Sequence, residues 1–257
     1  MNDKKDTSWG KVAGWYDEML ENKDGTYQKE VILPNLMRLI NPQKGEKIID
    51  IACGQGFFSR TLQEAGAEVT GADIAKELIS LAKMHSSQSI NFEVAPADAL
   101  AFAKDATFDK ALIVLALQNI ENLQGALREA YRVLKPGGTF YIVLNHPAFR
   151  IPKSSSWNWD HETHRQYRRI DSYMSDARER IEMNPGAQKA GEKRFTISFH
   201  RPLQLYFKIL NKAGFLMGRV EEWVSHKKSN AGPRQAEEDR IRKEIPMFLF
   251  IEAKKVI

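Results

Sequence analysis

The stretch of sequence that decides the fold is IIDIACGQGF, residues 48–57. Its first half is a short apolar run with β-branched residues, which predicts a strand buried on both faces. Its second half brings small residues close together, so the backbone can turn sharply and approach a ligand before a helix begins. In open α/β sheets such a turn lies at the ligand crevice.

The residues around this turn narrow the kind of ligand. A phosphate-binding loop needs Gly-Lys-Ser/Thr, whereas Gly56 is followed by Phe57 and Phe58. A dinucleotide-binding loop has a third glycine at the position where Ser59 stands. Asp50 would repel a phosphate but suits a ligand that carries an ammonium or a sulfonium.

Strand and helix patterns alternate along the chain. A helical segment at 9–41 precedes the alternation, and the apolar pattern predicts a parallel sheet with helices on both faces. The predicted strands are 47–52, 67–73, 90–95, 108–117, 139–144, 215–224 and 247–255. The predicted helices are 57–65, 75–85, 123–134 and 202–213, with a helical turn at 236–243.

Residues 145–200 interrupt this alternation with aromatic and charged side chains, over a length that exceeds a simple turn. Within them, Asn184-Pro185-Gly186 predicts a turn between short strands at 178–183 and 194–199. We interpret the insertion as a lid, or a small subdomain, over the carboxyl edge of the sheet.

Five motifs follow one another in the order and at the spacing of a known family. They are the D-x-A-x-G-x-G run from Asp50 to Gly56, the acid Asp73, Ala97-Asp98-Ala99, Phe108-Asp109, and Leu134-Lys-Pro-Gly-Gly138. As a set they resemble the class I methyltransferases that depend on S-adenosylmethionine (SAM). Ala52 departs from the glycine that many members have at that position.

The resemblance implies an α/β fold with a doubly wound, mostly parallel, seven-stranded Rossmann-like sheet and a lid insertion after the fifth strand. Four regions follow from it. Residues 1–44 would be a helical prelude that closes over the cofactor, 45–144 the SAM-binding core, 145–200 the lid that binds the acceptor, and 201–257 the completion of the sheet.

The resemblance also implies where SAM, or its product S-adenosylhomocysteine, binds. Asp50 and the loop 52–56 would flank the methionine part, and Asp73 would bind the ribose hydroxyls. Ile74, Asp98 and Ala99 would contact the adenine, and Leu115 would lie at the methyl end. The full predicted set is Tyr16, Tyr27, Asp50, Ala52, Cys53, Gly54, Gly56, Asp73, Ile74, Asp98, Ala99 and Leu115.

Three of these residues have a plain structural alternative. Tyr16 and Tyr27 resemble aromatic residues that close over the cofactor in related enzymes, but they could equally pack the prelude against the core. Cys53 is interpreted as a small buried residue rather than a nucleophile.

The roots of the insertion supply the candidates for chemistry. A histidine stands at each root, His146 before Pro147 and His200 before Arg201. Because imidazole titrates near neutral pH, either could accept a proton from the methyl acceptor, and a hinge histidine bonded to backbone is the alternative. Arg201 could bind an acceptor carboxylate or form a surface ion pair.

The aromatic residues of the insertion are candidates for substrate binding. Trp157, Trp159 and Tyr173 could form the apolar walls of an acceptor pocket, or instead the core of the lid itself. The insertion also contains His161 and His164 beside two acids, but without a cysteine or a distant third ligand we expect no metal site.

The absence of two motifs limits the classes of methyl acceptor that the sequence allows. Residues 115–120 lack the Asn/Asp-Pro-Pro-aromatic motif of enzymes that methylate base or glutamine amino groups, and no Pro-Cys nucleophile follows them. We therefore expect transfer of a methyl group to an oxygen or nitrogen of a small molecule, by in-line displacement under the lid. An RNA or protein methyltransferase, or a SAM-binding protein that does not methylate, are the alternatives.

The composition of the chain bears on its partners and on its location in the cell. The net charge is +5 with both signs mixed, which favours a solvated surface over a nucleic-acid partner. The single cysteine excludes an internal disulfide framework, and the longest apolar run, 111–117, is too short to cross a bilayer. We expect a cytoplasmic monomer or homodimer that has no membrane partner.

Overall fold

The computed structural model describes residues 9–183 and 193–256 of the 257-residue chain. The turn predicted at 184–186 lies outside the described residues. None of the helices in the described ranges is both long enough and apolar enough to span a membrane.

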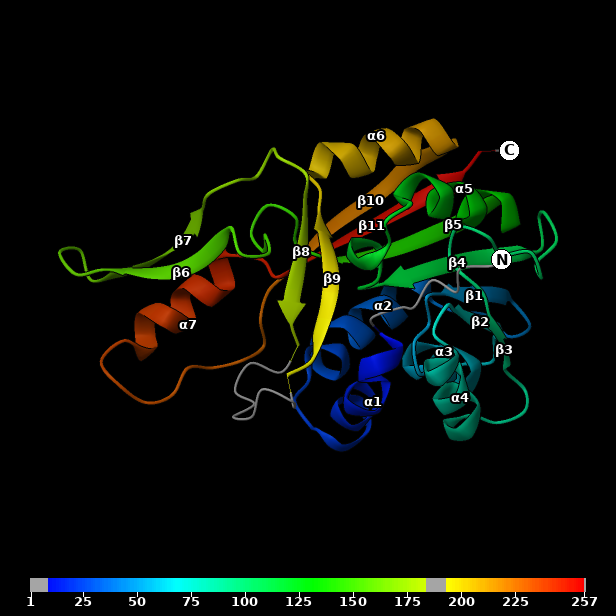
Figure 1. The fold of residues 1–257 in the computed structure, drawn as a ribbon, viewed down its shortest axis with the longest axis horizontal. Helices are drawn as coiled ribbons and strands as arrows, with labels where there is room; N and C mark the ends of the chain where they lie inside the picture. Colours follow the sequence, from blue (N-terminus) through cyan, green and yellow to red (C-terminus); the bar gives the residue numbers. More distant parts are fainter. Residues whose placement is uncertain (1–8, 184–192, 257) are drawn as a thin grey trace.

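The centre of the molecule is a seven-stranded sheet (Figure 1). Its strand order is β10-β11-β5-β4-β1-β2-β3, and β11 alone runs antiparallel to its neighbours. The strands are β1 (Lys47–Ile51), β2 (Glu68–Asp73), β3 (Asn91–Val94), β4 (Phe108–Val114), β5 (Leu134–Asn145), β10 (Phe215–Trp223) and β11 (Phe248–Lys255). This is the doubly wound, mostly parallel sheet that the sequence predicted, and its order reverses between β1 and β4.

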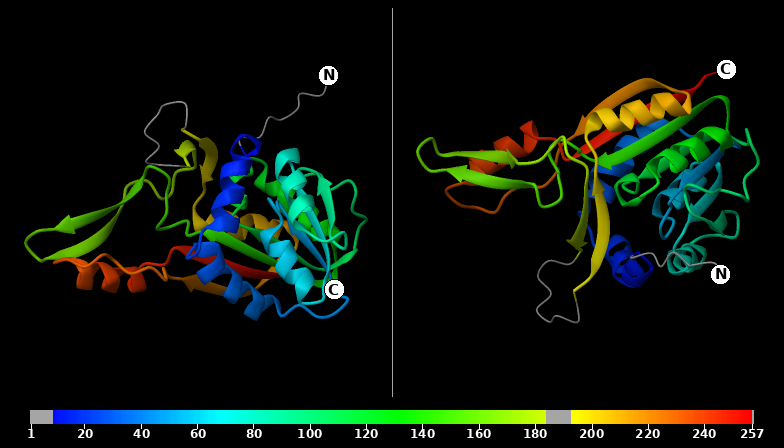
Figure 2. Two further views of the ribbon diagram at one scale, coloured as in Figure 1. Left: turned by 90° about the horizontal axis from the view of Figure 1, so that it is seen from below. Right: turned by 45° about the horizontal axis from the view of Figure 1, so that its top comes forward.

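Helices cover both faces of this sheet. α5 and α6 pack on one face, and α2, α3 and α4 pack on the other (Figures 1 and 2). Their bounds are α2 (Leu33–Ile40), α3 (Phe57–Glu64), α4 (Lys76–His85), α5 (Leu123–Val133) and α6 (Leu203–Ala213). In β1, Ile49 and Ile51 pack in the core cluster on one face of the sheet, and Ile48 packs in the cluster on the other face. Because both faces of this strand are buried, apolar residues do not alternate with polar ones along it.

The helical segment predicted at 9–41 is broken in two. A short 3-10 turn, η1 (Gly10–Val12), leads into α1 (Ala13–Asn22), and a π-helical turn, η2 (Gln28–Ile32), leads into α2. Between them Gly25 adopts φ 67°, a left-handed conformation that an α-helix does not tolerate. The helical periodicity was correct on either side, but the break at Gly25 lets α1 turn toward the carboxyl edge of the sheet.

The insertion after β5 consists of two separate hairpins. The first pairs β6 (Ser155–Asp160) with β7 (Arg165–Ile170), and the second pairs β8 (Ala177–Glu182) with β9 (Phe195–His200). β6 and β7 extend to one side of the sheet together with α7 (Gln235–Glu244), whereas β8 and β9 lie across its carboxyl edge (Figure 1). The predicted strand pair around residue 186 corresponds to β8 and β9.

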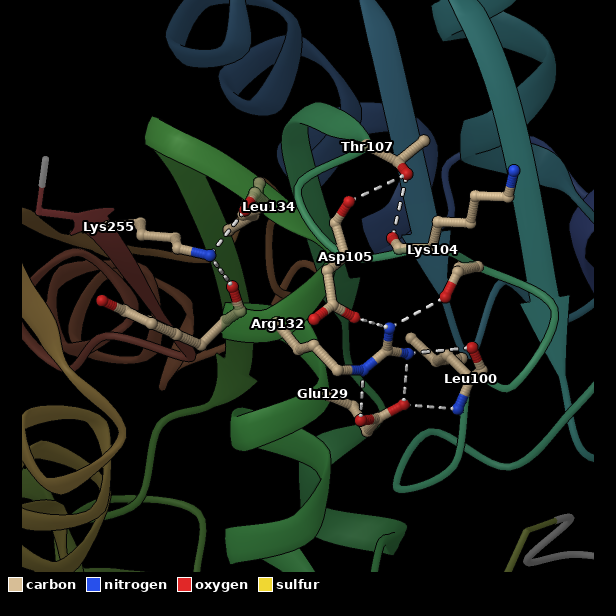
Figure 3. Close-up of polar contacts among 10 residues, drawn as sticks. Leu100, Lys104, Asp105, Thr107, Glu129, Arg132, Leu134 and Lys255 are labelled. Atoms are coloured by element: carbon tan, nitrogen blue, oxygen red, sulfur yellow. Dashed lines mark hydrogen bonds and ion pairs between the residues drawn. The ribbon is translucent and has the colours of Figure 1, made fainter.

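An arginine of α5 holds the loop that leads from β3 to β4. Arg132 donates hydrogen bonds to the carbonyls of Leu100 and Ala103 and to the carboxylates of Asp105 and Glu129 (Figure 3). The Glu129 carboxylate in turn accepts the N–H of Leu100 at 2.7 Å. Because this loop also contains Asp98, the network positions one wall of the site described next.

Candidate functional site

A cavity of about 400 Å³ opens at the carboxyl ends of the central strands. The segment that follows each of four strands contributes to it. These are residues 52 and 54 after β1, 73–74 at the end of β2, 95–98 after β3, and 114–116 at the end of β4. The cavity therefore occupies the point where the strand order reverses, which is the ligand crevice of open α/β sheets. We call it the first cavity.

Asp73 is fixed at the edge of the first cavity. Its Oδ2 accepts the N–H of Gly54 at 3.0 Å, and its Oδ1 accepts the N–H of Ala75 at 2.8 Å. Burial raises the pKa of this carboxyl, and the N–H donors of Ala75 and Gly54 act in the opposite direction. The carboxylate thus ties the loop after β1 to the end of β2 and lines the cavity.

Asp98 lines the opposite wall of the first cavity. Its Oδ2 accepts a hydrogen bond from Nδ2 of Asn122 at 2.8 Å. The same asparagine caps the N-terminus of α5, where its Oδ1 accepts the N–H of Gly125 at 3.0 Å. A capping residue therefore orients a carboxylate of the site.

Asp50 lies beneath the loop and does not line the first cavity. It is 1% exposed, and its Oδ2 accepts a hydrogen bond from Oγ of Ser59 at 2.6 Å. Burial raises the pKa of Asp50 to about 7, although the Ser59 hydroxyl lowers it. Ser59, the residue that argued against a dinucleotide loop, therefore joins the start of α3 to the end of β1.

Four other residues of the predicted cofactor set lie outside the first cavity. Cys53 is buried, Ala99 donates its N–H to the carbonyl of Pro96 within a turn, and Tyr27 lines a different cavity. Gly56 has φ 80°, and a Cβ built there would lie 2.9 Å from Cζ of Phe92. A glycine is needed at 56 for backbone conformation and packing rather than for approach to a ligand.

The remaining predicted residues do line the first cavity, and two of them have an unusual backbone. Ala52 and Leu115 have φ 58° and 53°, in the left-handed region. Non-glycine residues held in that region concentrate at functional sites. They follow the adjacent strands β1 and β4, so both strained residues face the same crevice. The other lining members of the set are Tyr16, Gly54, Asp73, Ile74 and Asp98.

A second cavity of about 460 Å³ adjoins the first. It is lined by the prelude, by the segments after β4 and β5, by both hairpins and by the start of β11. Its apolar lining includes Trp15, Met19, Tyr27, Ile181 and Phe248, and its polar lining includes Arg150 and Arg168. We call it the second cavity.

The β8–β9 hairpin separates the two cavities because strand residues alternate between its faces. Arg178 and Phe199, which pair across the hairpin, line the first cavity. Ile181 and Thr196, also a pair, line the second. Four residues line both cavities and form their shared boundary: Trp9, Tyr16, Leu115 and Asn119.

Neither predicted catalytic histidine lines either cavity. His146 is 3% exposed, with Nε2 2.7 Å from Oε1 of Glu222, and its Nδ1 accepts the N–H of Ala148 at 3.2 Å. His200 is 4% exposed, with Nε2 2.7 Å from the carbonyl oxygen of Tyr173. Both rings thus act within the roots of the insertion. A role for either as a base requires that the root rearrange, and it stays a prediction.

Arg201 and Tyr173 also lie outside the cavity linings. Arg201 is buried and donates to the carbonyls of Leu117, Ile120 and Glu121, which fastens the end of β9 to the segment after β4. The Tyr173 hydroxyl accepts the N–H of Leu203 at 3.0 Å. Neither the acceptor carboxylate nor the surface ion pair considered for Arg201 is needed to explain its contacts.

The two tryptophans lie on the arm formed by β6, β7 and α7. The Arg168 guanidinium carbon lies 5.1 Å from the centroid of the Trp157 ring, and that of Arg234 lies 4.6 Å from Trp159. Neither ring lines the first or the second cavity. The sequence predicted that they would form the walls of an acceptor pocket or the core of the lid, and a role in acceptor binding stays a prediction.

Sequence reasoning missed the residues that build the second cavity. Trp15 and Met19 lie one helical turn apart on α1, and this spacing was the only local signal for them. Arg150, Arg168 and Phe248 come from three distant segments that only the tertiary structure brings together.

Among the described residues, one group offers three ligand atoms within 4.8 Å of one another: Asp17, Glu21 and His85. Their side chains already have protein partners. His85 contacts Asp17 at 2.9 Å, and Glu21 accepts hydrogen bonds from Arg60 and Gln55. His161 and His164 are not part of this group.

A crevice at the switch point of a doubly wound sheet, with a carboxylate at the end of β2, defines a class of proteins that bind a nucleoside cofactor. Comparison with known proteins is more specific. Residues 49–142 match the model of a family described as a methyltransferase domain. A SAM-dependent methyltransferase from Mesorhizobium loti has the same fold, with a TM-score of 0.69 at 27% identity over 86% of this chain and 96% of that one. These findings support a class I SAM-dependent methyltransferase.

Curated relatives match a shorter part of the chain. A demethylmenaquinone methyltransferase from Tropheryma whipplei is 36% identical over 113 residues, which is 43% of this chain and 46% of that protein. A ubiquinone biosynthesis O-methyltransferase from Bordetella avium is 28% identical over 147 residues, 56% of this chain and 59% of that protein. The chain thus spans about half the length of these relatives.

Proposed function

We propose that this protein transfers the methyl group of SAM, bound in the first cavity, to a small molecule bound in the second. The observation that carries the proposal is the boundary that the two cavities share, where Leu115 and Asn119 line both. Methyl transfer by direct displacement requires donor and acceptor to meet in line, away from water. Two adjoining cavities with one shared boundary meet that requirement.

The lining of the first cavity fits SAM in charge as well as in position. It contains the carboxylates of Asp73, Asp98 and Glu121 and a single cation, Arg178. SAM carries an ammonium and a sulfonium, which a cavity with an excess of carboxylates attracts. Asp73, at the end of β2, would bind the ribose hydroxyls, and Ile74 and Asp98 would contact the adenine. When bound, SAM supplies an electrophilic methyl group.

The chain itself supplies positioning and the exclusion of water. Tyr16 of α1 covers the loop after β1, since a Cβ built at Gly54 would lie 3.6 Å from its ring. The β8–β9 hairpin covers the carboxyl edge from the other side. The concave second cavity, with its largely apolar lining, supports a small acceptor over RNA or protein. Because the single cysteine favours a reducing setting, the cytoplasm remains the proposed location.

Labelled methyl transfer tests the proposal. The protein is incubated with methyl-labelled SAM and, in separate reactions, a panel of small phenols and amines, total RNA and denatured cell protein. We expect label in at least one small molecule, with one S-adenosylhomocysteine formed per methyl. Label that enters only RNA or protein would overturn the small-molecule acceptor, and no binding of SAM by calorimetry would overturn the proposal as a whole.

A variant at the shared boundary of the two cavities makes this test more specific. Asn119→Phe adds bulk where the two cavities meet, and should lower turnover at least tenfold while S-adenosylhomocysteine binds within about threefold of its normal affinity. Unchanged turnover would show that the methyl group does not cross this boundary.

A further inference from the structure

The second cavity has an unusual charge. Its lining contains two arginines, Arg150 and Arg168, and no aspartate, glutamate, lysine or histidine among the described residues. The first cavity shows the opposite balance, with three carboxylates and one arginine. A guanidinium does not lose its proton in proteins, so the second cavity has a fixed positive charge.

Every partner that the two guanidinium groups have in the described chain is neutral. Arg150 donates from Nη1 to Oδ1 of Asn145 at 2.6 Å. Arg168 donates from Nε to the carbonyl of Phe149 and from Nη2 to Oγ of Ser155, both at 2.7 Å. These bonds hold the two side chains in place but leave other N–H donors of each guanidinium for a ligand.

The two charges lie close enough to affect one another. Burial and the positive charge of Arg168 both lower the pKa of Arg150, and burial also lowers that of Arg168. Two half-buried cations without a counter-charge are costly, because each loses part of its hydration and repels the other. An anion between them would relieve both costs.

The rest of the lining limits what else the ligand can be. Trp15, Met19, Ile181 and Phe248 present apolar surface, and the Phe248 ring also lies 5.6 Å from the Arg150 guanidinium carbon. A cavity of about 460 Å³ accommodates one or two rings or a short alkyl chain but not a polymer. The occupant is therefore a small molecule with an apolar body and an anionic group.

We propose that the methyl acceptor carries a carboxylate, which Arg150 and Arg168 bind, and an apolar body that lies against Trp15 and Met19. A planar carboxylate matches the fork geometry of guanidinium donors. The inference rests on the proposed function in one respect only, namely that the occupant of the second cavity is the acceptor. Anion binding itself can be measured without turnover.

Three matched ligands test the inference by calorimetry on protein saturated with S-adenosylhomocysteine: 2-naphthoate, its neutral amide 2-naphthamide, and 2-naphthyl phosphate. We expect 2-naphthoate to bind at least tenfold more tightly than 2-naphthamide. Equal affinity of the acid and the amide would overturn the inference. Tighter binding of the phosphate than of the carboxylate would overturn the assignment of a carboxylate.

Variants locate the binding site. Arg150→Met removes the charge but keeps an unbranched stem beside Phe248, and it should reduce the preference for the acid over the amide about tenfold. Arg168→Gln should also reduce the preference for the acid about tenfold. If Arg168→Gln does not fold, Arg150→Met alone decides the test. Arg169→Gln is the matched control, since Arg169 is the neighbour of Arg168 on β7, is exposed and pairs with Asp171. A preference that survives Arg150→Met would overturn the inference.

The outcome separates this inference from the proposed function. S-adenosylhomocysteine affinity is measured first for every variant. If the cofactor binds and the acid shows no preference, only the carboxylate inference fails. If the cofactor does not bind while the acid is still preferred, the proposed function fails and the anion site stands.

Discussion

The two cavities are neighbours but differ in origin and in charge. Most of the first is lined by segments that directly follow β1, β2, β3 and β4. The second takes its lining from the prelude, from the segment after β5, from both hairpins and from β11. Carboxylates prevail in the first and arginines in the second. The proposed cofactor site is thus built from the repeating unit of the fold, and the proposed acceptor site mostly from segments added around it.

This difference bears on how the family diversifies. The first cavity depends on backbone turns and on carboxylates at the ends of strands, which any sequence of this fold must keep to bind the same cofactor. The second depends on an insertion and a prelude that the fold does not require. The chain spans only about half the length of the curated relatives that it matches.

The largest effect that would test this comparison is on Asp73. Asp73→Ala should weaken binding of S-adenosylhomocysteine about a hundredfold, because a charged acceptor at a buried site contributes ~2–3 kcal/mol. The affinity for 2-naphthoate in the second cavity should not change. Calorimetry with each ligand measures both.

Two further variants control for folding in that experiment. Asp73→Asn keeps one oxygen for the N–H donors of Gly54 and Ala75, and Asp24→Ala removes a fully exposed carboxylate elsewhere. We expect an intermediate loss of affinity for the first and none for the second. Equal loss of both ligands in Asp73→Ala would mean that the two cavities are not independent.

A smaller effect on turnover is expected at the histidines that belong to neither cavity. His146→Gln and His200→Gln should each change turnover per folded molecule less than about threefold, since both rings bond to groups at the roots of the insertion. Steady-state kinetics, with the folded fraction measured by circular dichroism, decides this. A base would instead lower the rate ~10²–10⁴-fold on replacement, and such a fall would restore the catalytic role that the sequence predicted.

The pH dependence of the free energy of unfolding tests separately whether the His146 ring is buried. Burial lowers its pKa from the ordinary 6.5, and the Glu222 carboxylate only partly offsets this. The unfolded chain therefore binds the proton more readily than the folded chain, so stability is lost as the pH falls below about 6.5. His146→Gln should remove this contribution. Urea unfolding of both proteins at several pH values between 5 and 8 measures how the free energy of unfolding depends on pH. The same pH dependence in His146→Gln as in the unsubstituted protein would show that His146 is not buried as described.

The smallest expected effect is at Ala52, the departure from the family's usual glycine. Because Ala52 has φ 58°, Ala52→Gly should relieve left-handed strain and stabilise the protein by ~0.5–1 kcal/mol. Ala65→Gly is the matched control, since Ala65 has φ −77° and gains nothing from the substitution. Thermal unfolding of both variants measures the difference. Destabilisation of equal size in both would mean that the loop after β1 is not strained.

Short-range sequence patterns predicted most of the fold. The apolar run at 48–52 is buried on both faces, the alternation of strands and helices holds, and the residues after each strand lie where parallel strands bring them together. Asp73 and Asp98 line the first cavity because the carboxyl ends of parallel strands meet at one edge. The break in the prelude was missed because helical periodicity persists on both sides of Gly25.

Tertiary structure alone decided what the insertion does. Trp157 was predicted as a pocket wall or part of the lid's core, but it lies on the hairpin that extends with α7. Phe199, which the sequence did not single out, lies on the hairpin that crosses the carboxyl edge and lines the first cavity. His146 and His200 stand beside the crevice in sequence, yet their rings bond within the roots of the insertion. No local pattern paired Arg150 with Arg168. Only the fold places them in one cavity, whose lining has no carboxylate among the described residues.

The sequence by itself thus determined the sheet, the cofactor crevice and the family, because each depends on residues a few positions apart and on the fixed geometry of parallel strands. Which side chains form the acceptor cavity was decided only by tertiary structure. That cavity depends on the directions of two hairpins and on contacts between residues more than a hundred positions apart, which no local pattern encodes.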